Sequence, residues 1–351
     1  MFKRKVIVIL LSILILGGGA LGVKKLLTPK EEVVKISLVQ QEKSLAMIPH
    51  LLAQEKNFFR DFLVKVQIRI NSGDELPQEA LARGHADIIV MELADFLYNR
   101  YQNADLIAFA AITAREPSFI MAREEMPSFT WQDMRDKSVI GAAPESTAGI
   151  MLEAALREND MAPYRNVTVL YNIPEDLRSG AFQAGSSTYI QTSEPAVSRL
   201  EAEGHAFVIK SLAEKNIPSL VYVTNSSIMK RHPEKIQRFT NGIYKSYLWM
   251  HYHPEQIAGT LQSHFKEMER NIFDTAVNRY LKAGIWPEEP MVSRDAVKEF
   301  LEMMLTAGEL PRTFDCSGAV EQRFGRKALE DVEYIPPEQE KKGLQKLWPF
   351  S

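Results

Sequence analysis

Short apolar runs alternate with helical stretches along most of this chain, and this alternation limits the possible folds more than any other feature of the sequence. The first series of predicted strands and helices covers residues 33–39, 46–54, 63–70, 76–83 and 87–91. The second series covers residues 139–141, 147–159, 167–171, 174–184 and 188–192. Strand–helix–strand order predicts parallel strands joined by right-handed crossovers, so we expect an α/β protein.

Residues 139–156, VIGAAPESTAGIMLEAAL, connect a buried strand to a helix through a tight loop of small residues and one proline. We expect the helix to begin near Ser146 or Thr147. The first turn of a helix has free N–H groups and the positive end of the helix dipole, and a strand end that leads into it can receive a ligand. An ordinary connection with a Ser or Thr cap explains the same residues. Both interpretations stay open for this stretch alone.

Length and composition exclude several classes of protein. A chain of 351 residues with 45% hydrophobic content can bury a sizeable core and is long enough for two domains. The net charge of -3, without a basic run that contains aromatic residues, argues against nucleic-acid binding. The single cysteine, Cys316, excludes an intrachain disulfide framework and a zinc site built on several cysteines. The histidines are scattered, so we expect no metal site, and no motif indicates a cofactor.

The first 27 residues have the pattern of an export signal. Lys3, Arg4 and Lys5 precede an apolar run at 6–16, and small residues follow it at Ala20 and Gly22. Residues 1–27 are therefore predicted to be a signal peptide or an uncleaved N-terminal membrane anchor. Because no cysteine follows the apolar run, we expect no lipid attachment there. The predicted location is the periplasm or the outer face of the bacterial cytoplasmic membrane.

Five segments resemble motifs of one family of binding proteins. They are PHLLAQEKNFF at 49–59, ALARGHADI at 80–88, the stretch 139–156, GSSTYIQTSEP at 185–195 and HPEKIQRFTNGIYKSYLWMHYHP at 232–254. Together they resemble the ABC-transporter solute-binding proteins for nitrate, sulfonate, taurine and thiamine precursors. The chain departs from the family pattern at three positions. Asn57 replaces a glycine, Thr188 an aspartate and Ser193 a tryptophan; the last change removes a stacking surface for a flat ligand.

The resemblance implies a two-lobe, type II periplasmic-binding-protein-like fold with two hinge crossings and a cleft between the lobes. Lobe I would comprise residues 33–113 plus 226–326, and lobe II residues 114–225. The helices predicted after residue 226 are expected to pack on lobe I, and residues 327–351 to form a loosely held tail. The implied function is the capture of a small organic molecule or anion for delivery to an ABC permease.

In such a fold the ligand lies among loops at the carboxyl ends of strands from both lobes. The candidates that this rule selects are Gln40, Gln41, Ser44, Met91, Glu92, Thr113, Ser146, Thr147, Ser193, Glu194 and Tyr222. Two glutamates in the cleft would favour a ligand with an amine or amidine-like nitrogen. Glu194 equally fits a role as a cap of the helix that follows it. Arg115 fits either an anion clamp or a bridge between the lobes.

Two other functions remain as alternatives. The first is an enzyme on the same scaffold, like the thiamine-pyrimidine synthases, which carry a cysteine-rich motif and an active-site histidine. Cys316 lies far from the predicted cleft loops in the sequence, so the chain is predicted not to be an enzyme. The second alternative is an anchored sensor of the ligand. The leading prediction is a monomeric binding protein.

Overall fold

The computed structural model describes residues 32–336, so the predicted signal peptide or anchor at 1–27 lies outside the described residues. Between residues 32 and 336, none of the helices combines the length and the apolar composition that a membrane span needs.

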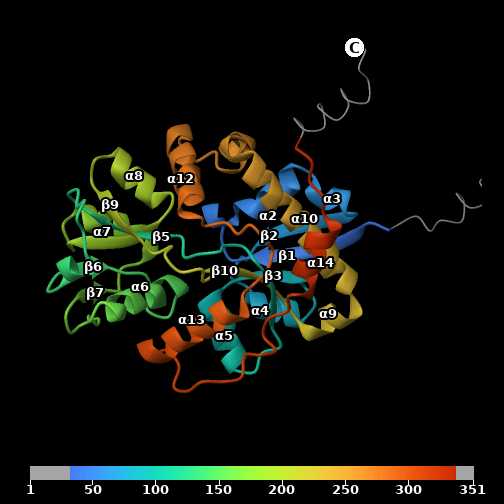
Figure 1. Ribbon diagram of the computed structural model, residues 1–351, viewed down its shortest axis with the longest axis horizontal. Coiled ribbons are helices and arrows are strands. Elements are labelled where there is room, and N and C mark those ends of the chain that lie inside the picture. Colours follow the sequence, from blue (N-terminus) through green and yellow to red (C-terminus); the bar gives the residue numbers. More distant parts are fainter. Residues whose placement is uncertain (1–31, 337–351) are drawn as a thin grey trace, which may run out of the picture. The chain divides into compact units, whose positions relative to one another are not determined.

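Strands and helices alternate through the first two thirds of the described chain (Figure 1). The strands are β1 (Val34–Gln40), β2 (Val64–Ile70), β3 (Ile88–Glu92), β4 (Ile107–Ala111), β5 (Ser118–Ala122), β6 (Ser138–Ile140), β7 (Thr168–Leu170), β8 (Tyr189–Ser193), β9 (Phe207–Ser211) and β10 (Leu220–Thr224). The α-helices between and directly after them are α2 (Ile48–Glu55), α3 (Phe58–Asp61), α4 (Pro77–Ala82), α5 (Leu93–Tyr101), α6 (Thr147–Glu158), α7 (Glu175–Gln183), α8 (Ala196–Ala202) and α9 (Ser226–Arg231). The C-terminal helices are α10 (Pro233–Tyr252), α11 (Ile257–Leu261), α12 (Arg270–Ala283), α13 (Arg294–Ala307) and α14 (Arg323–Asp331).

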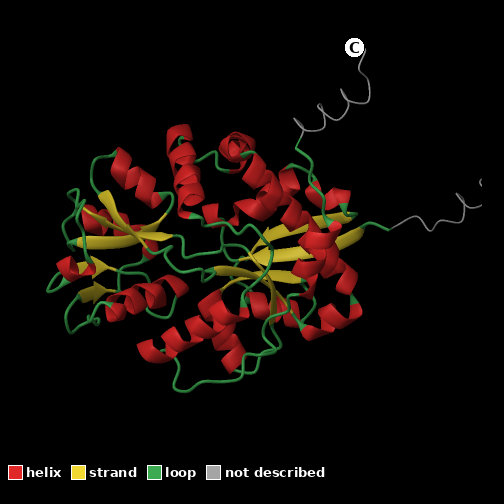
Figure 2. Ribbon diagram, in the orientation of Figure 1, coloured by secondary structure: helices red, strands yellow, loops and turns green. Residues whose placement is uncertain are grey.

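The strands form two five-stranded sheets, which appear as separate groups of arrows in Figure 2. The first sheet has the order β2-β1-β3-β10-β4, and the second has the order β7-β6-β8-β5-β9. Strand β1 is parallel to β3, and β6 is parallel to β7 and β8. Strand β10 is antiparallel to both of its neighbours, and so is β5. The α/β prediction is confirmed, but both sheets are mixed and not purely parallel.

The two sheets follow one plan, because the fourth strand of each enters from the other sheet. The chain passes from β4 to β5 through residues 112–117 and returns from β9 to β10 through residues 212–219. These are the two crossings of the two-lobe fold, whose lobes are the two sheets with their helices. Strand β10 bonds to β3 and β4, so its predicted place in lobe II is wrong. Local patterning can identify a strand, but the pairing of distant strands decides its sheet.

Each sheet packs its own apolar core. In the first, Phe59 stacks on Phe239 of α10, and Phe239 makes edge contacts with Phe109 and Tyr222. In the second, buried side chains such as Trp131 join strand residues in a separate cluster. Asn57, which ends the loop between α2 and α3, has φ 60°, a left-handed conformation that asparagine tolerates and that fits its place where the family pattern has glycine.

The sequence predicts that the C-terminal helices pack on the first lobe. In the structure, not all of them pack on that lobe alone. Helix α10 lies against α2 and α3. Helices α12 and α13 contact both lobes: α12 packs on α11 and on α8 of the second lobe, and α13 packs on α5 and on α6 of the second lobe. Arg279 of α12 forms an ion pair with Glu194 at 2.7 Å and a second one with Glu201. The prediction is therefore incomplete for α12 and α13, which pack on the second lobe as well as on the first.

The beginning of the predicted tail is also ordered against the core. Helix α14 extends past residue 327 and buries Phe324 and Ala328, which are one helical turn apart, against α10. After it, Tyr334 stacks on Tyr252 and bonds through its hydroxyl to His253 at 2.8 Å. The high charge of this segment lies on the outer face of an amphipathic helix, so a loose tail is wrong for residues 327–334. Residues 337–351 are outside the described part.

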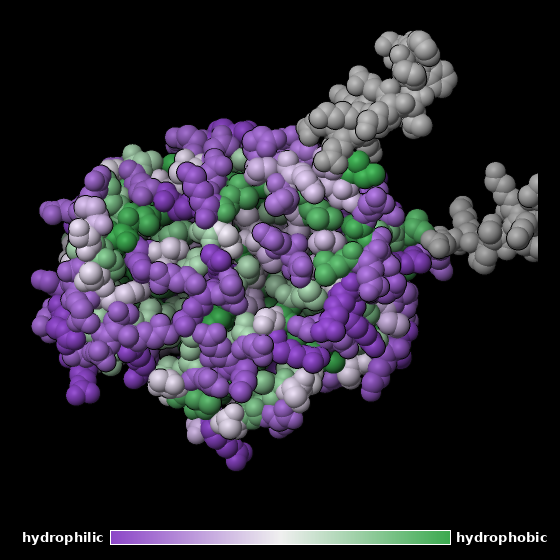
Figure 3. Space-filling view, in the orientation of Figure 1, coloured by the Kyte–Doolittle hydropathy of each residue, from purple (hydrophilic) through white to green (hydrophobic). Residues whose placement is uncertain are grey.

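Hydrophilic residues dominate the face shown in Figure 3, where apolar residues form small, scattered groups. Scattered apolar side chains of this kind are usual on protein surfaces.

Candidate functional site

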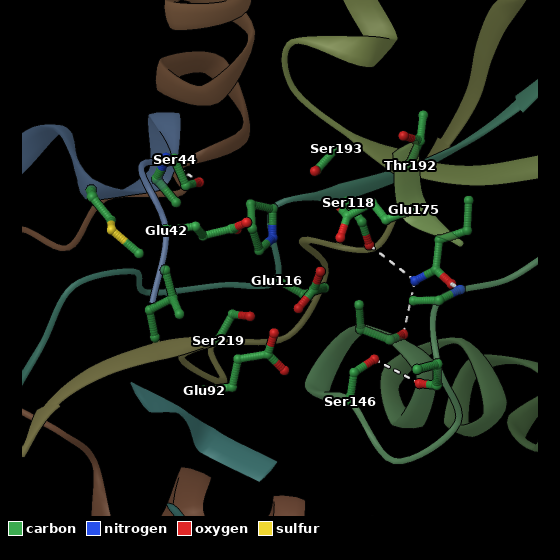
Figure 4. Close-up of a pocket in the computed structure, with 18 of the residues that line it drawn as sticks. Glu42, Ser44, Glu92, Glu116, Ser118, Ser146, Glu175, Thr192, Ser193 and Ser219 are labelled. Atoms are coloured by element: carbon green, nitrogen blue, oxygen red, sulfur yellow. Dashed lines mark hydrogen bonds between the residues drawn. The ribbon is translucent and has the colours of Figure 1, made fainter. Parts of the chain in front are cut away.

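A cavity of about 310 Å³ opens between loops of the two sheets (Figure 4). Its lining comprises Glu42, Ser44, Ala46, Met47, Glu92, Glu116, Pro117, Ser118, Ala142, Ala143, Ser146, Ala148, Glu175, Arg178, Gln191, Thr192, Ser193, Ser219, Leu220 and Tyr280. The side of the first sheet supplies the loop after β1 and the end of β3. The second supplies the loop before α6, the start of α7 and the end of β8. Both crossings contribute, so the cavity lies where the two-lobe fold predicts a cleft.

The wall on the side of the second sheet is held by one buried amide. The Gln191 side chain accepts from the Ala142 backbone N–H at 3.0 Å and donates to the Ser118 hydroxyl at 3.1 Å and to the Ala148 carbonyl at 2.8 Å. These bonds join β8, β5 and the loop before α6. The wall is therefore preorganised before a ligand arrives.

The loop before α6 also needs glycine at one position. A Cβ atom on Gly149 would lie 2.0 Å from the Ala143 carbonyl oxygen, far inside van der Waals contact. Ser146 caps the helix, because its hydroxyl accepts from the Gly149 N–H at 3.1 Å. The loop folds tightly over the first turn of α6 and brings Ala142, Ala143 and Ser146 to the cavity.

Two residues cap each other's helices across the cleft. The Glu92 carboxylate accepts from the backbone N–H of Thr147, the first residue of α6, at 3.0 Å. In return the Thr147 hydroxyl accepts from the N–H of Ala94 in the first turn of α5, at 3.1 Å. Each lobe therefore supplies a polar side chain to a helix N-terminus of the other. The N-terminus of α6 already holds a carboxylate.

Burial is the main influence on the pKa of the Glu92 carboxylate. Desolvation raises the pKa of Glu92 to about 7, the bond from Thr147 lowers it, and the charges of Asp95, Glu116 and Glu175 raise it. At neutral pH the side chain is close to its midpoint. Added positive charge in the cleft would favour its ionised form.

Glu116 lies in the first crossing and is the most buried carboxylate of the cavity, with 2% of its surface exposed. Its Oε2 atom has no hydrogen-bond partner. Burial raises the pKa of Glu116, and interactions with Ser219 and Ser118 lower it. Figure 4 shows its carboxylate, with those of Glu42 and Glu92, directed toward the middle of the cavity.

Charged side chains also lie at the mouth of the cavity. Glu42 follows β1, and its partial withdrawal from water, together with the charge of Glu175, raises its pKa. Arg178 of α7 is the one cationic side chain in the lining, and its Nε atom donates to the Ile173 carbonyl at 3.1 Å. The cavity thus combines four carboxylates and one guanidinium with several hydroxyl groups.

The structure brings four of the predicted residues together in this lining: Ser44, Glu92, Ser146 and Ser193. Ser44 and Ser146 also cap helices, since the Ser44 hydroxyl accepts from the Ala46 N–H at 3.2 Å. Their predicted role in ligand binding remains a prediction.

The other predicted residues are not in the lining. Gln40 and Tyr222 are buried on either side of His50, bonded to its ring nitrogens at 2.8 and 3.0 Å. Met91 is buried in the sheet, and the Thr113 hydroxyl accepts from the N–H groups of Ser219 and Leu220. The remaining three have other environments: Gln41 is exposed, Thr147 is buried, and Glu194 is buried with Arg279.

The contacts of Glu194 and Arg115 bear on the alternative roles that the sequence left open for them. The Glu194 carboxylate accepts from the Ser198 N–H in α8 at 3.0 Å, so it has the capping role considered for it. Arg115 donates to Asn216 at 2.9 Å and to the carbonyls of Ala213 and Ala283 at 3.4 Å. It braces the second crossing and α12 through neutral groups, and among residues 32–336 it forms no salt bridge.

Sequence reasoning missed several polar residues of the cavity. They are Glu42, Glu116, Ser118, Glu175, Arg178, Gln191, Thr192, Ser219 and Tyr280. A signal existed for some of them, since Gln191 and Thr192 directly precede Ser193 at the same strand end, and Glu116 stands in the predicted first crossing. Tyr280 carried no local signal, because it comes from α12, whose position depends on long-range packing.

The order of elements, the interlobe cavity and the sequence comparison lead to one family. The model of the NMT1/THI5-like family matches residues 45–257, which is more than half of the chain. The chain belongs to the NMT1/THI5-like family. This confirms the resemblance found in the sequence.

A curated relative of this NMT1/THI5-like chain is "Putative binding protein YtlA" of Bacillus subtilis (strain 168). It is 22% identical over 307 residues, which are 86% of this chain and 92% of the relative. Two solved structures show the fold. The periplasmic aliphatic sulphonate binding protein SsuA from Escherichia coli is 18% identical, with a TM-score of 0.65 over 86% of this chain and 96% of that one. The periplasmic nitrate-binding protein NrtA from Synechocystis PCC 6803 is 14% identical, with a TM-score of 0.63 over 88% and 91%.

Proposed function

We propose that this chain is an extracytoplasmic solute-binding protein, which captures a small molecule between its lobes and delivers it to an ABC permease in the membrane. The observation that carries the proposal is the cavity itself, because its polar lining comes from both sheets and both crossings. A ligand that contacts both lobes would stabilise one relative arrangement of them, which a permease can recognise. The curated relative and the two solved structures with this fold are named as binding proteins, which supports the proposal.

The proposal includes export and a monomeric state. Residues 1–27 would direct the chain across the membrane, and either cleavage or retention of this segment as an anchor would place the cleft on the outer side. The periplasmic proteins among the structural neighbours support this location.

The enzyme alternative has less support from the arrangement of side chains. Among the described residues, neither histidine nor cysteine lines the cleft. His50 is buried with its two ring nitrogens bonded to Gln40 and Tyr222, and Cys316 lines a different cavity beside α13. The sensor alternative uses the same cleft and differs only in the partner that recognises the loaded protein.

Thermal denaturation of the purified chain with a panel of small solutes tests this function. A ligand that binds only the folded protein raises the free energy of unfolding by about 2.7 kcal/mol at a hundredfold excess over Kd. We expect such a shift, a stoichiometry of one per chain, and recovery of the solute unchanged by mass spectrometry. Sustained conversion of a bound solute into product would contradict the proposal and support the enzyme alternative.

A further inference from the structure

The ionisable side chains of the cleft are unevenly balanced in charge. Its lining contains four glutamates and one arginine. Each glutamate comes from a different element: Glu42 from the loop after β1, Glu92 from β3, Glu116 from the first crossing and Glu175 from α7. Among the ion pairs of residues 32–336, none joins Arg178 to any of these four carboxylates. The negative charge is therefore not neutralised by direct pairs within the described protein.

Glu116 provides a second and independent observation. A buried carboxylate oxygen without a hydrogen-bond partner loses its hydration and receives nothing in exchange, which is costly. The Glu116 Oε2 atom is in this state, and its side chain points into the cavity (Figure 4). A donor from a ligand would satisfy it, and a positively charged donor would form the stronger bond.

The N-terminus of α6 is the feature of the cleft that would attract an anion, but its N–H groups already bond to side chains of the protein. The first N–H of α6 bonds to Glu92 from the opposite lobe, and the Gly149 N–H bonds to Ser146. An incoming sulfonate or nitrate would have to displace the Glu92 carboxylate and then lie near three other glutamates. The geometry of the cleft therefore favours positive charge over negative charge.

The carboxylates come from separate walls of the cavity and do not form a cluster of metal-ligand spacing. Within the described residues there is no group of three or more His, Cys, Asp or Glu side chains placed to hold a metal ion. Separated acceptors around a cavity of about 310 Å³ suit a molecule that presents several donors in different directions.

We propose that the cleft binds a small organic cation with several N–H donors, an amine or amidine, whose charged nitrogen bonds to Glu116 Oε2 while Glu92 and Glu42 complete the negative surroundings. This assignment rests on the proposed solute-binding function and names the chemical class of the solute. Hydroxyls of Ser118, Ser193 and Ser219 also line the cavity.

Titration calorimetry on the purified full chain tests the assignment with a panel matched by charge. The cationic probes are putrescine, spermidine, agmatine and benzamidine; the anionic probes are nitrate and ethanesulfonate; choline carries a positive charge without N–H donors. We expect at least one of the four N–H cations to bind with a Kd of about 10 mM or below. Choline, nitrate and ethanesulfonate should bind with a Kd at least tenfold higher.

Variants locate the site. Glu116→Gln keeps the shape and removes the charge, and it should weaken binding of that cation at least tenfold. Glu42→Gln, at the exposed mouth, should weaken it by a smaller factor even if Glu116→Gln fails to fold. Glu125→Gln removes the same charge from an exposed position outside the cavity and should bind like the parent.

The outcomes separate this inference from the proposed function. Tighter binding of nitrate or ethanesulfonate than of every amine would overturn the cationic class and leave solute binding intact. Unchanged binding in both Glu116→Gln and Glu42→Gln would overturn the site. The absence of binding by every probe would count against the cationic class and the proposed function together.

Discussion

Replacement of Glu92 by glutamine is expected to change how the stability of the protein depends on pH. In the folded protein the pKa of Glu92 is raised from 4.5 to about 7, chiefly because burial disfavours the charged form. The carboxylates of Asp95, Glu116 and Glu175 face it and add to the shift, while the Thr147 N–H opposes it. Glutamine keeps an acceptor for this N–H and cannot ionise.

The sign of the effect follows from proton binding. Between pH 4.5 and pH 7 the folded protein holds the Glu92 proton more tightly than the unfolded chain does, so the free energy of unfolding falls as the pH rises. Below pH 4.5 both states are protonated, and above pH 7 both are ionised, so the slope vanishes outside this window. A shift of about 2.5 pKa units at about 1.4 kcal/mol per unit gives a loss of at most about 3.5 kcal/mol.

Urea denaturation at pH 4.5, 5.5, 6.5 and 7.5 measures this directly. The stability of Glu92→Gln relative to the parent should rise across the series by up to about 3 kcal/mol, with the rise concentrated below pH 7. Glu125→Gln controls for the loss of one negative charge at an exposed site. Parallel curves for the parent and Glu92→Gln would refute the reasoning, because Glu92 would then have the same pKa in both states.

Three further predictions follow from individual contacts. Gly149→Ala should destabilise the protein by about 2 kcal/mol or more, since its Cβ would meet the Ala143 carbonyl, while Gly180→Ala in the open interior of α7 should stabilise it by about 0.5–1 kcal/mol; melting temperatures distinguish the two. Arg279→Ala leaves the buried Glu194 carboxylate without its ion pair and should lower the free energy of unfolding in urea by about 3–5 kcal/mol. Arg270→Ala breaks an exposed pair with Asp274 and should lower it by under about 1 kcal/mol. Similar losses in the two variants would contradict the role of burial. Burial lowers the pKa of His50 to about 3, so its ring should stay neutral in NMR titration from pH 8 to pH 4. The stability that the neutral ring contributes is present above pH 6.5 and is lost as the pH falls from 6.5 toward 3. A titration midpoint near 6.5 in the folded protein would disprove this.

The sequence predicts local structure in this chain much better than it predicts partners. Strand and helix patterns depend on neighbouring residues, so the elements around residues 139–156 are correct, including the helix cap at Ser146. The sheet to which β10 belongs is decided by its bonds with β3 and β4, which are more than a hundred residues away in the chain. The pattern of β10 is the same whichever sheet accepts it.

The candidate site shows the same division. The rule of strand ends finds Glu92 and Ser193 because any side chain there lies close to the cleft. It fails for Gln40, whose side chain turns away to donate to the Glu42 carbonyl and to accept from His50, since alternate residues of a strand face opposite sides. Glu116 was missed because a glutamate beside a proline in a connecting segment resembles a solvated loop residue, and only the assembled crossings bury it.

A crystal structure of the full chain with the amine or amidine that binds most tightly tests the central claim most directly. We predict one ligand in the cleft between the two sheets, with a nitrogen about 2.7–3.2 Å from Glu116 Oε2 and contacts from both lobes. A ligand bound elsewhere, or one in the cleft that leaves Glu116 Oε2 without a donor, would contradict it.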